Sequence, residues 1–380
     1  MRPVPNDLPR GGIWIHAVSV GEVEVARRLV AELESRQHRA PVVVTVTTAT
    51  GLDLARSSLA GRAAVAPSPV DLAGPVSRFL DAAEPSALVL VETELWPEML
   101  HQTGERGIPI LVVNARLSES SFRAYHRVRG LLKPLLRPIR LVLARDQTDV
   151  ERFAALGIDE KRIAVGGNVK YDLQRDDRPL DWQASLPELA RGRPVLVAGS
   201  TMEGEEEMVL DAVAQLAEPG PFLVLAPRHP ERFDAVASLL AQRGLPTVRR
   251  SVLESRPDGP SDALLIDTIG ELARAYRLAD VAFIGGSLLP TGGHNPLEPA
   301  VWGVPVVTGP HVFNFEEVYR ELGEAGASQV VGTPDELATV LAEWFAAPRE
   351  RQRRGAAGLA VVEANRGATA TVVDALLGVL

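Results

Sequence analysis

Short apolar runs recur along the chain, and each is followed by a longer stretch with apolar residues three or four positions apart. The clearest early runs are 13–18, 42–47, 87–91 and 110–113. Continuous apolar runs of this length are typical of strands in a parallel sheet, because helices cover both faces of such a sheet. Regular alternation of strands and amphipathic helices therefore predicts a doubly wound α/β fold.

The alternation of strands and helices occurs twice. The first series ends at 163–165, residues 173–194 are polar and irregular, and a second series begins at 195–198. A chain of 380 residues is also long for one hydrophobic core. We therefore predict an N-terminal domain of residues 1–172, a linker of residues 173–194 and a C-terminal domain of residues 195–380.

The composition narrows the class of function. The formal net charge of −9 argues against a general nucleic-acid binder, which usually has a basic domain. The chain has no cysteine, which excludes disulfides, thiolate metal sites and cysteine nucleophiles, and no run of closely spaced histidines suggests a metal site. No apolar run approaches the roughly 20 residues of a membrane span, and the N-terminal residues lack a signal-peptide core.

The first apolar run leads into the string HAVSVGE, in which Glu22 opens the following helix. Ligands of doubly wound sheets bind beyond the carboxyl ends of the strands, which is where Glu22 is expected to lie. Ser19 and Glu22 also have the spacing of a capping box, and this spacing alone favours a structural role for Glu22.

Two carboxylates follow the run 87–91 in the string ETELWP. Glu92 and Glu94 would point the same way if the strand continued, and this crowding would raise the pKa of at least one of them. The alternative is that one carboxylate caps the next helix and the other is solvated.

Two basic residues also follow strands. Lys170 stands in the string GNVKYD at the end of the first domain, where a loop lysine by itself is most often solvent-facing. Arg228 stands in PRHP after the run 222–226, and its planar guanidinium group suits a phosphate better than a lysine would.

The stretch 283–310 combines glycine-rich turns with a helix start. Asn295 is a favourable N-cap, Pro296 suits the first helical turn, and Glu298 has the position of a capping-box variant. Glycines allow close approach of a ligand, and the N–H groups of a helix start attract phosphate. On spacing alone, an equally good interpretation is that Glu298 only closes the box and the glycines only turn the chain.

The segment 116–145 is locally basic in an acidic chain. Eight Lys and Arg residues face one acid, Glu119, and aromatic and aliphatic residues such as Phe122, Tyr125 and Leu131 are interleaved with them. A basic run is usually a solvated face. The interleaving instead indicates an amphipathic, cationic segment of the kind that lies on anionic membranes.

Taken together, HAVSVGE, ETELWP, NARLS, GNVKYD, PRHP and the stretch 283–310 resemble the motifs of Kdo transferases. These enzymes move the acidic sugar 3-deoxy-D-manno-octulosonic acid (Kdo) from CMP-Kdo to a lipid A precursor such as lipid IVA. The resemblance runs from about Trp14 to Phe315. It implies two Rossmann-like domains facing across a cleft (the GT-B arrangement), with the last helix packing on the N-terminal domain.

The resemblance also implies roles for residues. The N-terminal domain would hold the acceptor, with Glu22 as catalytic base and Glu92 and Lys170 supporting the transition state. The C-terminal domain would hold CMP through Pro227, Arg228, His229, Ile269, Gly270, Glu271, Gly286, Ser287, Asn295, Pro296, Leu297 and Glu298. The acceptor surface would include Arg116, Arg123, Arg127 and Arg129. The family tends to have methionine where Ile269 stands.

We therefore expect an inverting glycosyltransferase of lipopolysaccharide inner-core synthesis that needs neither metal nor other cofactor. Its expected partners are CMP-Kdo, the lipid A precursor and an anionic membrane surface. Family members usually carry an N-terminal membrane anchor, which the sequence as given does not show, either because it is truncated or because the anchor is absent by nature. For the chain as given, we expect peripheral attachment at the cytoplasmic face of the inner membrane. Two alternatives stay open: a nucleotide-sugar epimerase of the same fold, and a lipid A-binding protein without activity.

Overall fold

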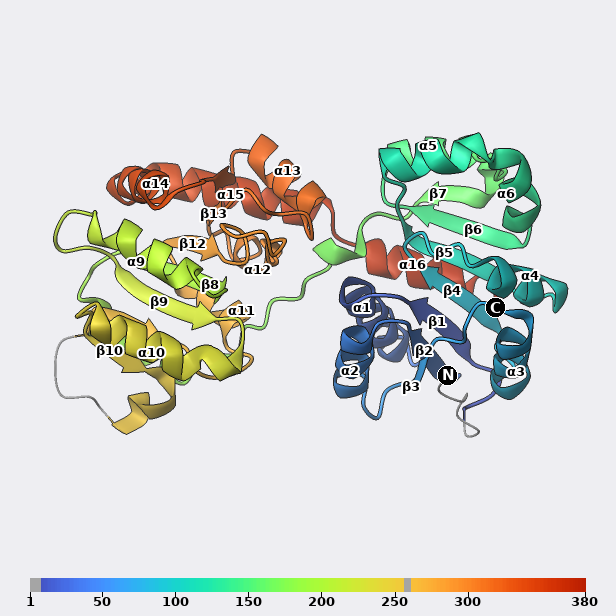
Figure 1. Cartoon of the computed structure of the whole chain (residues 1–380), viewed down its shortest axis with the longest axis horizontal. Helices are drawn as coiled ribbons and strands as arrows, with labels where there is room; N and C mark the ends of the chain where they lie inside the picture. Colours follow the sequence, from blue (N-terminus) through green and yellow to red (C-terminus); the bar gives the residue numbers. More distant parts are fainter. Residues whose placement is uncertain (1–7, 256–260) are drawn as a thin grey trace. The chain divides into compact units, whose positions relative to one another are not determined.

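The computed structural model describes residues 8–255 and 261–380 and divides the chain into two compact units. Unit 1 comprises Met1–Asp172 together with Asn365–Leu380, and unit 2 comprises Leu173–Ala364. Each unit is built on its own seven-stranded sheet, and every neighbouring pair of strands is parallel (Figure 1). Both units therefore have the predicted doubly wound, Rossmann-like architecture.

The sheet of unit 1 has the strand order β3-β2-β1-β4-β5-β6-β7. Its strands are β1 (Ile13–Ala17), β2 (Val42–Val46), β3 (Ala64–Pro67), β4 (Ala87–Val91), β5 (Ile110–Ala115), β6 (Ile139–Ala144) and β7 (Ile163–Val165). Its helices are α1 (Val20–Ser35), α2 (Ala49–Ser58), α3 (Ala73–Ala83), α4 (Pro97–Glu105), α5 (Glu119–Arg127), α6 (Arg129–Leu136), α7 (Gln147–Ala155) and α16 (Ala368–Leu377), with 3₁₀ turns η1 (Glu160–Arg162) and η2 (Val169–Tyr171).

Alternate residues of the central strands in unit 1 face two separate cores. Ile13 and Ile15 of β1 pack under α1, α2 and α16, whereas Trp14 packs under α3 on the other face of the sheet. Both faces are covered, which explains why the strands appear in the sequence as continuous apolar runs rather than as alternating patterns.

The sheet of unit 2 has the strand order β10-β11-β9-β8-β12-β13-β14. Its strands are β8 (Val195–Thr201), β9 (Phe222–Pro227), β10 (Thr247–Arg249), β11 (Ala263–Leu265), β12 (Val281–Ile284), β13 (Val306–Thr308) and β14 (Ser328–Val330). Its helices are α8 (Leu186–Ala190), α9 (Glu205–Ala214), α10 (Phe233–Gln242), α11 (Leu272–Ala275), α12 (Leu297–Ala300), α13 (Glu316–Glu324), α14 (Pro334–Ala346) and α15 (Pro348–Ala364), with 3₁₀ turns η3 (Gln183–Ser185), η4 (Pro230–Arg232), η5 (Arg250–Ser255) and η6 (Tyr276–Leu278).

The segment 173–194 belongs to unit 2 and is not a free linker, which corrects the sequence-based boundary. Leu180, Trp182 and Leu186 are buried in the same core as β9 and β11. Arg175 donates from Nε to the carbonyl of Val301 at 2.7 Å. Because only a few apolar residues are buried in an otherwise polar segment, the sequence did not indicate that the segment packs on the core.

The chain ends on unit 1. Helix α15 ends at Ala364 in unit 2, and a separate last helix, α16, follows and belongs to unit 1. The carboxylate of Asp172 caps α16, accepting from Gly367 N at 2.6 Å and Thr369 N at 2.5 Å. Figure 1 shows α16 beside α1, where Arg36 pairs with Asp374. The C-terminal helix therefore supports the helix that begins beside Glu22.

Candidate active site

Glu22 lies in the first turn of α1, just beyond the carboxyl end of β1. Its carboxylate accepts from Val18 N at 2.7 Å and from Ser19 Oγ at 2.9 Å, and Ser19 Oγ in turn accepts from Glu22 N at 3.4 Å. The Ser19 half of the capping box is therefore formed, whereas the carboxylate reaches the N–H of Val18 rather than that of the N-cap residue Ser19. The side chain is also buried, with 5% of its surface exposed.

Burial makes Glu22 an unusual glutamate. Loss of water around the carboxylate raises its pKa from 4.5 to about 7, and the nearby negative charges of Glu92 and Glu94 add to the shift. The hydrogen bonds from Val18 and Ser19 act in the opposite direction. A carboxyl group that titrates near neutral pH is suited to accept a proton from a hydroxyl group.

His16, on β1, is the other titratable group at this end of the strand. It is fully buried, its Nδ1 lies 3.0 Å from Thr45 Oγ1, and burial lowers its pKa to about 4. A neutral imidazole without contact to solvent cannot take a proton from a substrate. This leaves Glu22 as the better candidate for a general base.

Glu92 follows β4, the neighbour of β1 in the sheet, and is held by two cations. Its Oε1 lies 2.6 Å from Arg145 Nη2 and 3.7 Å from Lys170 Nζ. The Arg145 side chain is only 3% exposed, against 26% for Glu92 and 19% for Lys170. The structure thus brings the three predicted catalytic residues to the carboxyl ends of the strands in unit 1. Lys170 also lies close to the first turn of α1, because its Nζ is 4.0 Å from the position of a Cβ built on Gly21.

Arg145 was counted in the sequence as part of the basic surface segment, and this was wrong. Its guanidinium group is buried and also donates from Nε to the carbonyl of Asn114 at 3.3 Å. Position alone could have indicated it, because Arg145 directly follows β6 just as Glu92 follows β4.

The backbone is strained at two points of this cluster. Glu92 has φ +60° and Asn114 has φ +53°, values that non-glycine residues rarely adopt. Asn114 Oδ1 accepts from Val169 N at 3.0 Å, next to Lys170. Such strain persists only where surrounding contacts hold it, and it is concentrated at functional sites.

Glu94 lies beyond Glu92 in the same turn and has a raised pKa, because the side chain is partly buried and because Glu92 lies nearby. The strand does not continue to Glu94, so the crowding predicted from an extended strand arises instead from a tight turn.

Arg116 lies next to the cluster of Glu22, Glu92 and Lys170 in unit 1. Its main chain is tied to Thr93, whose Oγ1 accepts from Arg116 N at 3.2 Å and donates to the Arg116 carbonyl. The other three predicted acceptor arginines, Arg123, Arg127 and Arg129, are exposed on α5 and α6. Arg123 pairs with Glu119 at 2.7 Å, and Arg129 Nη1 lies 2.9 Å from His126 Nε2.

In unit 2, the predicted CMP residues follow three strands. Pro227 ends β9 and is buried, whereas Arg228 and His229 are exposed directly after it. Ile269 and Gly270 follow β11, where the Ile269 side chain is 82% exposed and Gly270 has φ +87°. These residues are accessible.

The carboxylate of Glu271 is already engaged. It accepts from Arg250 Nε at 3.0 Å, from Thr268 Oγ1 at 2.8 Å and from Trp182 Nε1 at 3.3 Å. Glu271 therefore holds the turn together through its side chain, and its carbonyl accepts from Arg274 N at 3.1 Å and Ala275 N at 2.9 Å.

The turn after β12 differs from the expectation. Gly286 and Ser287, two of the residues predicted to bind CMP, both donate their main-chain N–H groups to the buried carboxylate of Glu205, at 2.6 Å and 2.8 Å. Glu205 had no predicted role. Ser200 and Glu203 have the spacing of a capping box but form none, because Ser200 has φ +57° and α9 begins only at Glu205.

The helix after Asn295 begins one residue later than predicted. Pro296 is the N-cap of α12, Glu298 is its second residue, and Leu297 is buried. Asn295 Oδ1 accepts from Leu297 N at 3.1 Å, so the asparagine does cap the turn. Its neighbour His294 has a pKa lowered to about 4, mainly by burial and further by Arg228 and His229.

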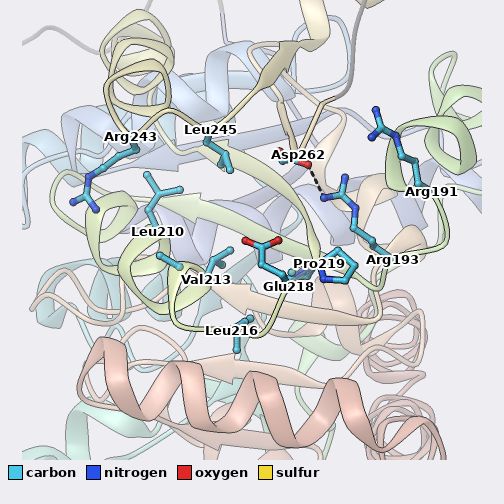
Figure 2. Close-up of a pocket in the computed structure, with 13 residues that line it drawn as sticks. Arg191, Arg193, Leu210, Val213, Leu216, Glu218, Pro219, Arg243, Leu245 and Asp262 are labelled. Carbon is cyan, nitrogen blue, oxygen red and sulfur yellow. Dashed lines mark hydrogen bonds and ion pairs between the residues drawn. The ribbon is translucent and has the colours of Figure 1, made fainter.

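A cavity of about 540 Å³ lies at the opposite, amino-terminal edge of the unit 2 sheet (Figure 2). Arg193, Pro221 and Asp262, which precede β8, β9 and β11, line it, and Arg193 pairs with Asp262 at 2.7 Å. No predicted site residue lines this cavity. In the part of the chain that the structure describes, no group of three or more His, Asp or Glu residues is placed to bind a metal ion.

Comparison with known proteins agrees with the motifs. The family model for 3-deoxy-D-manno-octulosonic-acid transferase (kdotransferase) matches residues 2–173. The 3-deoxy-D-manno-octulosonic acid transferase of Haemophilus influenzae is 39% identical over 97% of this chain and 87% of its own. The enzyme of the same name from Bordetella pertussis is 36% identical over 98% of this chain and 88% of its own.

The fold alone extends further than the family. The UDP-GlcNAc 2-epimerase from Neisseria meningitidis, solved with UDP-GlcNAc, superposes with a TM-score of 0.62 at 14% identity, covering 97% of this chain and 100% of its own. Epimerases and transferases share this architecture, so the fold does not choose between them. The sequence relationship does distinguish them: the chain belongs to the 3-deoxy-D-manno-octulosonic acid transferase family.

Proposed function

We propose that this chain transfers Kdo from CMP-Kdo to a sugar hydroxyl of a lipid A precursor such as lipid IVA, with inversion at the transferred carbon. The observation that carries the proposal is Glu22: a buried carboxyl with pKa about 7, in a chain 39% identical to a Kdo transferase over 97% of its length. One-step inversion needs a base on the side of the acceptor, and Glu22 takes that role.

Glu92 and Lys170 form an ion pair with each other beside the strand ends. Their fixed charges balance the charge that develops at the oxocarbenium-like centre in the transition state. CMP leaves with a single phosphate. Arg228, exposed after β9, and the turns at Gly270 and Asn295 bind this nucleotide in the proposal. Since fixed donors can neutralise one phosphate, the proposed reaction needs no metal.

The test is a product assay. The protein is incubated with CMP-Kdo and a tetraacylated lipid A precursor in detergent and EDTA, and the lipid is weighed by mass spectrometry. We expect a mass increase of one or more Kdo units. No increase in EDTA but an increase with added Mg²⁺ would contradict metal independence. If the lipid gains no mass under either condition and the protein does not bind CMP, the epimerase is favoured. If the lipid gains no mass but the protein still binds the lipid, the lipid-binding protein is favoured.

We also propose that the α5–α6 surface places the protein peripherally on the anionic, cytoplasmic face of the inner membrane. Helix α5 has no buried residue, and Leu131 of α6 is 81% exposed among Arg127, Arg129 and Lys133. Apolar side chains that enter the lipid interface and basic residues near anionic headgroups both contribute to such binding. No helix within residues 8–255 and 261–380 has the length and apolar character needed to cross a bilayer.

Vesicle binding checks this surface. Leu131→Asp is expected to weaken cosedimentation with vesicles containing anionic lipid about tenfold, because it removes an apolar side chain that would enter the lipid and adds a negative charge. Val330→Asp, at a residue 55% exposed on β14 of unit 2, is the matched control and should bind as wild type does. Equal binding by wild type and Leu131→Asp would show that this surface does not contact the membrane.

A further inference from the structure

Two consecutive glutamates at the start of α9 are completely buried. Glu205 and Glu206 are both 0% exposed, although glutamate is rarely buried without partners. The first turn of a helix favours carboxylates, because its N–H groups carry partial positive charge. That effect alone would leave the side chains at the surface, so their partners must explain the burial.

Glu205 accepts four main-chain hydrogen bonds. Oε1 accepts from Ser287 N and Leu288 N, each at 2.8 Å. Oε2 accepts from Gly286 N at 2.6 Å and from Met202 N at 2.9 Å. Three consecutive N–H groups of the turn after β12 thus converge on one carboxylate, in a geometry that would otherwise hold an anion. This turn is therefore filled from within the protein.

The turn that Glu205 fixes also accepts hydrogen bonds from the residues that follow it. The carbonyl of Gly286 accepts from Gly293 N at 2.5 Å and from Thr291 Oγ1 at 2.7 Å, and the carbonyl of Gly285 accepts from His294 N at 3.2 Å. His294 directly precedes Asn295. The position of the predicted nucleotide segment 295–298 thus depends on the turn that Glu205 fixes.

The same turn also connects to the loop after β13. Ser287 Oγ accepts from Gly309 N at 2.8 Å, and the Ser287 carbonyl accepts from His311 N at 3.0 Å. The loops after β12 and β13 therefore form one hydrogen-bonded body with Glu205 at its base.

Glu206 fixes the segment after β9 through its side-chain contacts. It makes a bidentate ion pair with Arg232, at 2.7 Å and 2.9 Å, and accepts from Thr201 Oγ1 at 2.8 Å. Arg232 ends η4, the turn that follows Arg228 and His229. Adjacent residues of one helix turn thus hold two of the three segments that carry the predicted nucleotide contacts.

We propose that Glu205 and Glu206 are positioning residues for the donor nucleotide: they fix the segments after β12 and β9 without touching CMP. The inference rests on the proposed function, since it presumes a CMP-linked donor in unit 2. It also excludes the N–H groups of Gly286, Ser287 and Leu288 from phosphate binding, because Glu205 occupies them.

Glu205→Gln is the decisive variant. The amide replaces one acceptor oxygen with an NH₂ group, which would face two N–H donors and release one side of the turn. We expect the KM for CMP-Kdo and the calorimetric Kd of CMP to rise about tenfold, while kcat at saturating donor stays within about threefold of wild type. A merely structural role would instead reduce the active fraction and lower the apparent kcat at unchanged KM.

Two further variants complete the test. Glu207→Gln changes the next residue, whose Oε2 has no hydrogen-bond partner, and should keep the wild-type KM. Arg232→Lys keeps the charge but loses the bidentate pair with Glu206, and should also raise the donor KM. If Glu205→Gln does not fold, Arg232→Lys decides. Unchanged KM and Kd in the folded variants, or an equal rise in Glu207→Gln, would overturn the proposal, whereas absence of CMP binding by wild type would overturn the proposed function itself.

Discussion

Glu22→Gln is expected to lower kcat about a thousandfold, the usual size of a general-base contribution. Glutamine preserves the shape of the side chain and one hydrogen-bond acceptor, so the first turn of α1 can remain in place. It cannot accept the proton of the attacking hydroxyl. Steady-state transfer assays measure the loss, with Glu24→Gln as the control. Glu24 is two residues away on the same helix and pairs at the surface with Arg27.

The pH profile separates the loss of a base from other defects. Glu22 must be deprotonated to act as a base, and its pKa is about 7. The wild-type kcat/KM should therefore fall about tenfold per pH unit below pH 7 and level off above it. This acidic limb should be absent from the residual activity of Glu22→Gln. A variant that keeps both wild-type turnover and the acidic limb would exclude Glu22 as the base.

Stability provides a second control for Glu22→Gln. The folded protein holds the Glu22 proton up to about pH 7, whereas the unfolded chain loses it near the ordinary value of 4.5. The stability of the wild type must therefore decline as pH rises through this window, by up to about 3 kcal/mol at 1.36 kcal/mol per pKa unit. Glutamine has no proton to lose, so denaturant unfolding at pH 8 should show a variant at least as stable as wild type. An inactive but stable variant would place the defect in the chemistry.

Most strands could be predicted from sequence because they are short, continuous apolar runs, whereas β10 (TVR) and β14 (SQV) contain polar residues and were missed. The segment 173–194 was misjudged because Trp182 and Leu180 are isolated apolar residues in a polar stretch, and only the tertiary structure shows the core that receives them. Periodicity detects regular elements, whereas single anchors leave no periodic signal.

Candidate site residues could be predicted only where they belong to a recognisable sequence motif. Glu22, Glu92 and Lys170 stand at strand ends, where doubly wound sheets bind ligands. Arg145 and Glu205 were missed because their partners are distant in sequence: Glu92 lies 53 residues from Arg145, and Gly286 lies 81 residues from Glu205. Main-chain partners such as those of Glu205 carry no sequence signature at all.

Lys170→Met is expected to lower kcat about a hundredfold, since loss of one fixed charge at a developing ionic centre costs roughly this much. The lysine is well suited to such a role. Its Nζ lies 3.7 Å from Glu92 Oε1, and its backbone is held in η2, where Asn168 Oδ1 accepts from Lys170 N at 3.1 Å. Two residues later, Asp172 ties the same segment to α16. The cation is therefore placed in advance of the reaction.

Removal of Lys170 should leave the fold intact, because Glu92 keeps its shorter ion pair with Arg145 at 2.6 Å. It should also leave the Kd of CMP unchanged, since the residues proposed to bind CMP belong to unit 2 and Lys170 belongs to unit 1. Lys161→Met, at an exposed lysine of η1, is the control. Transfer assays and CMP calorimetry measure both quantities. A loss confined to kcat in Lys170→Met alone would assign the lysine to the transition state, whereas weaker CMP binding with normal kcat would assign it to the ground state and remove it from the mechanism.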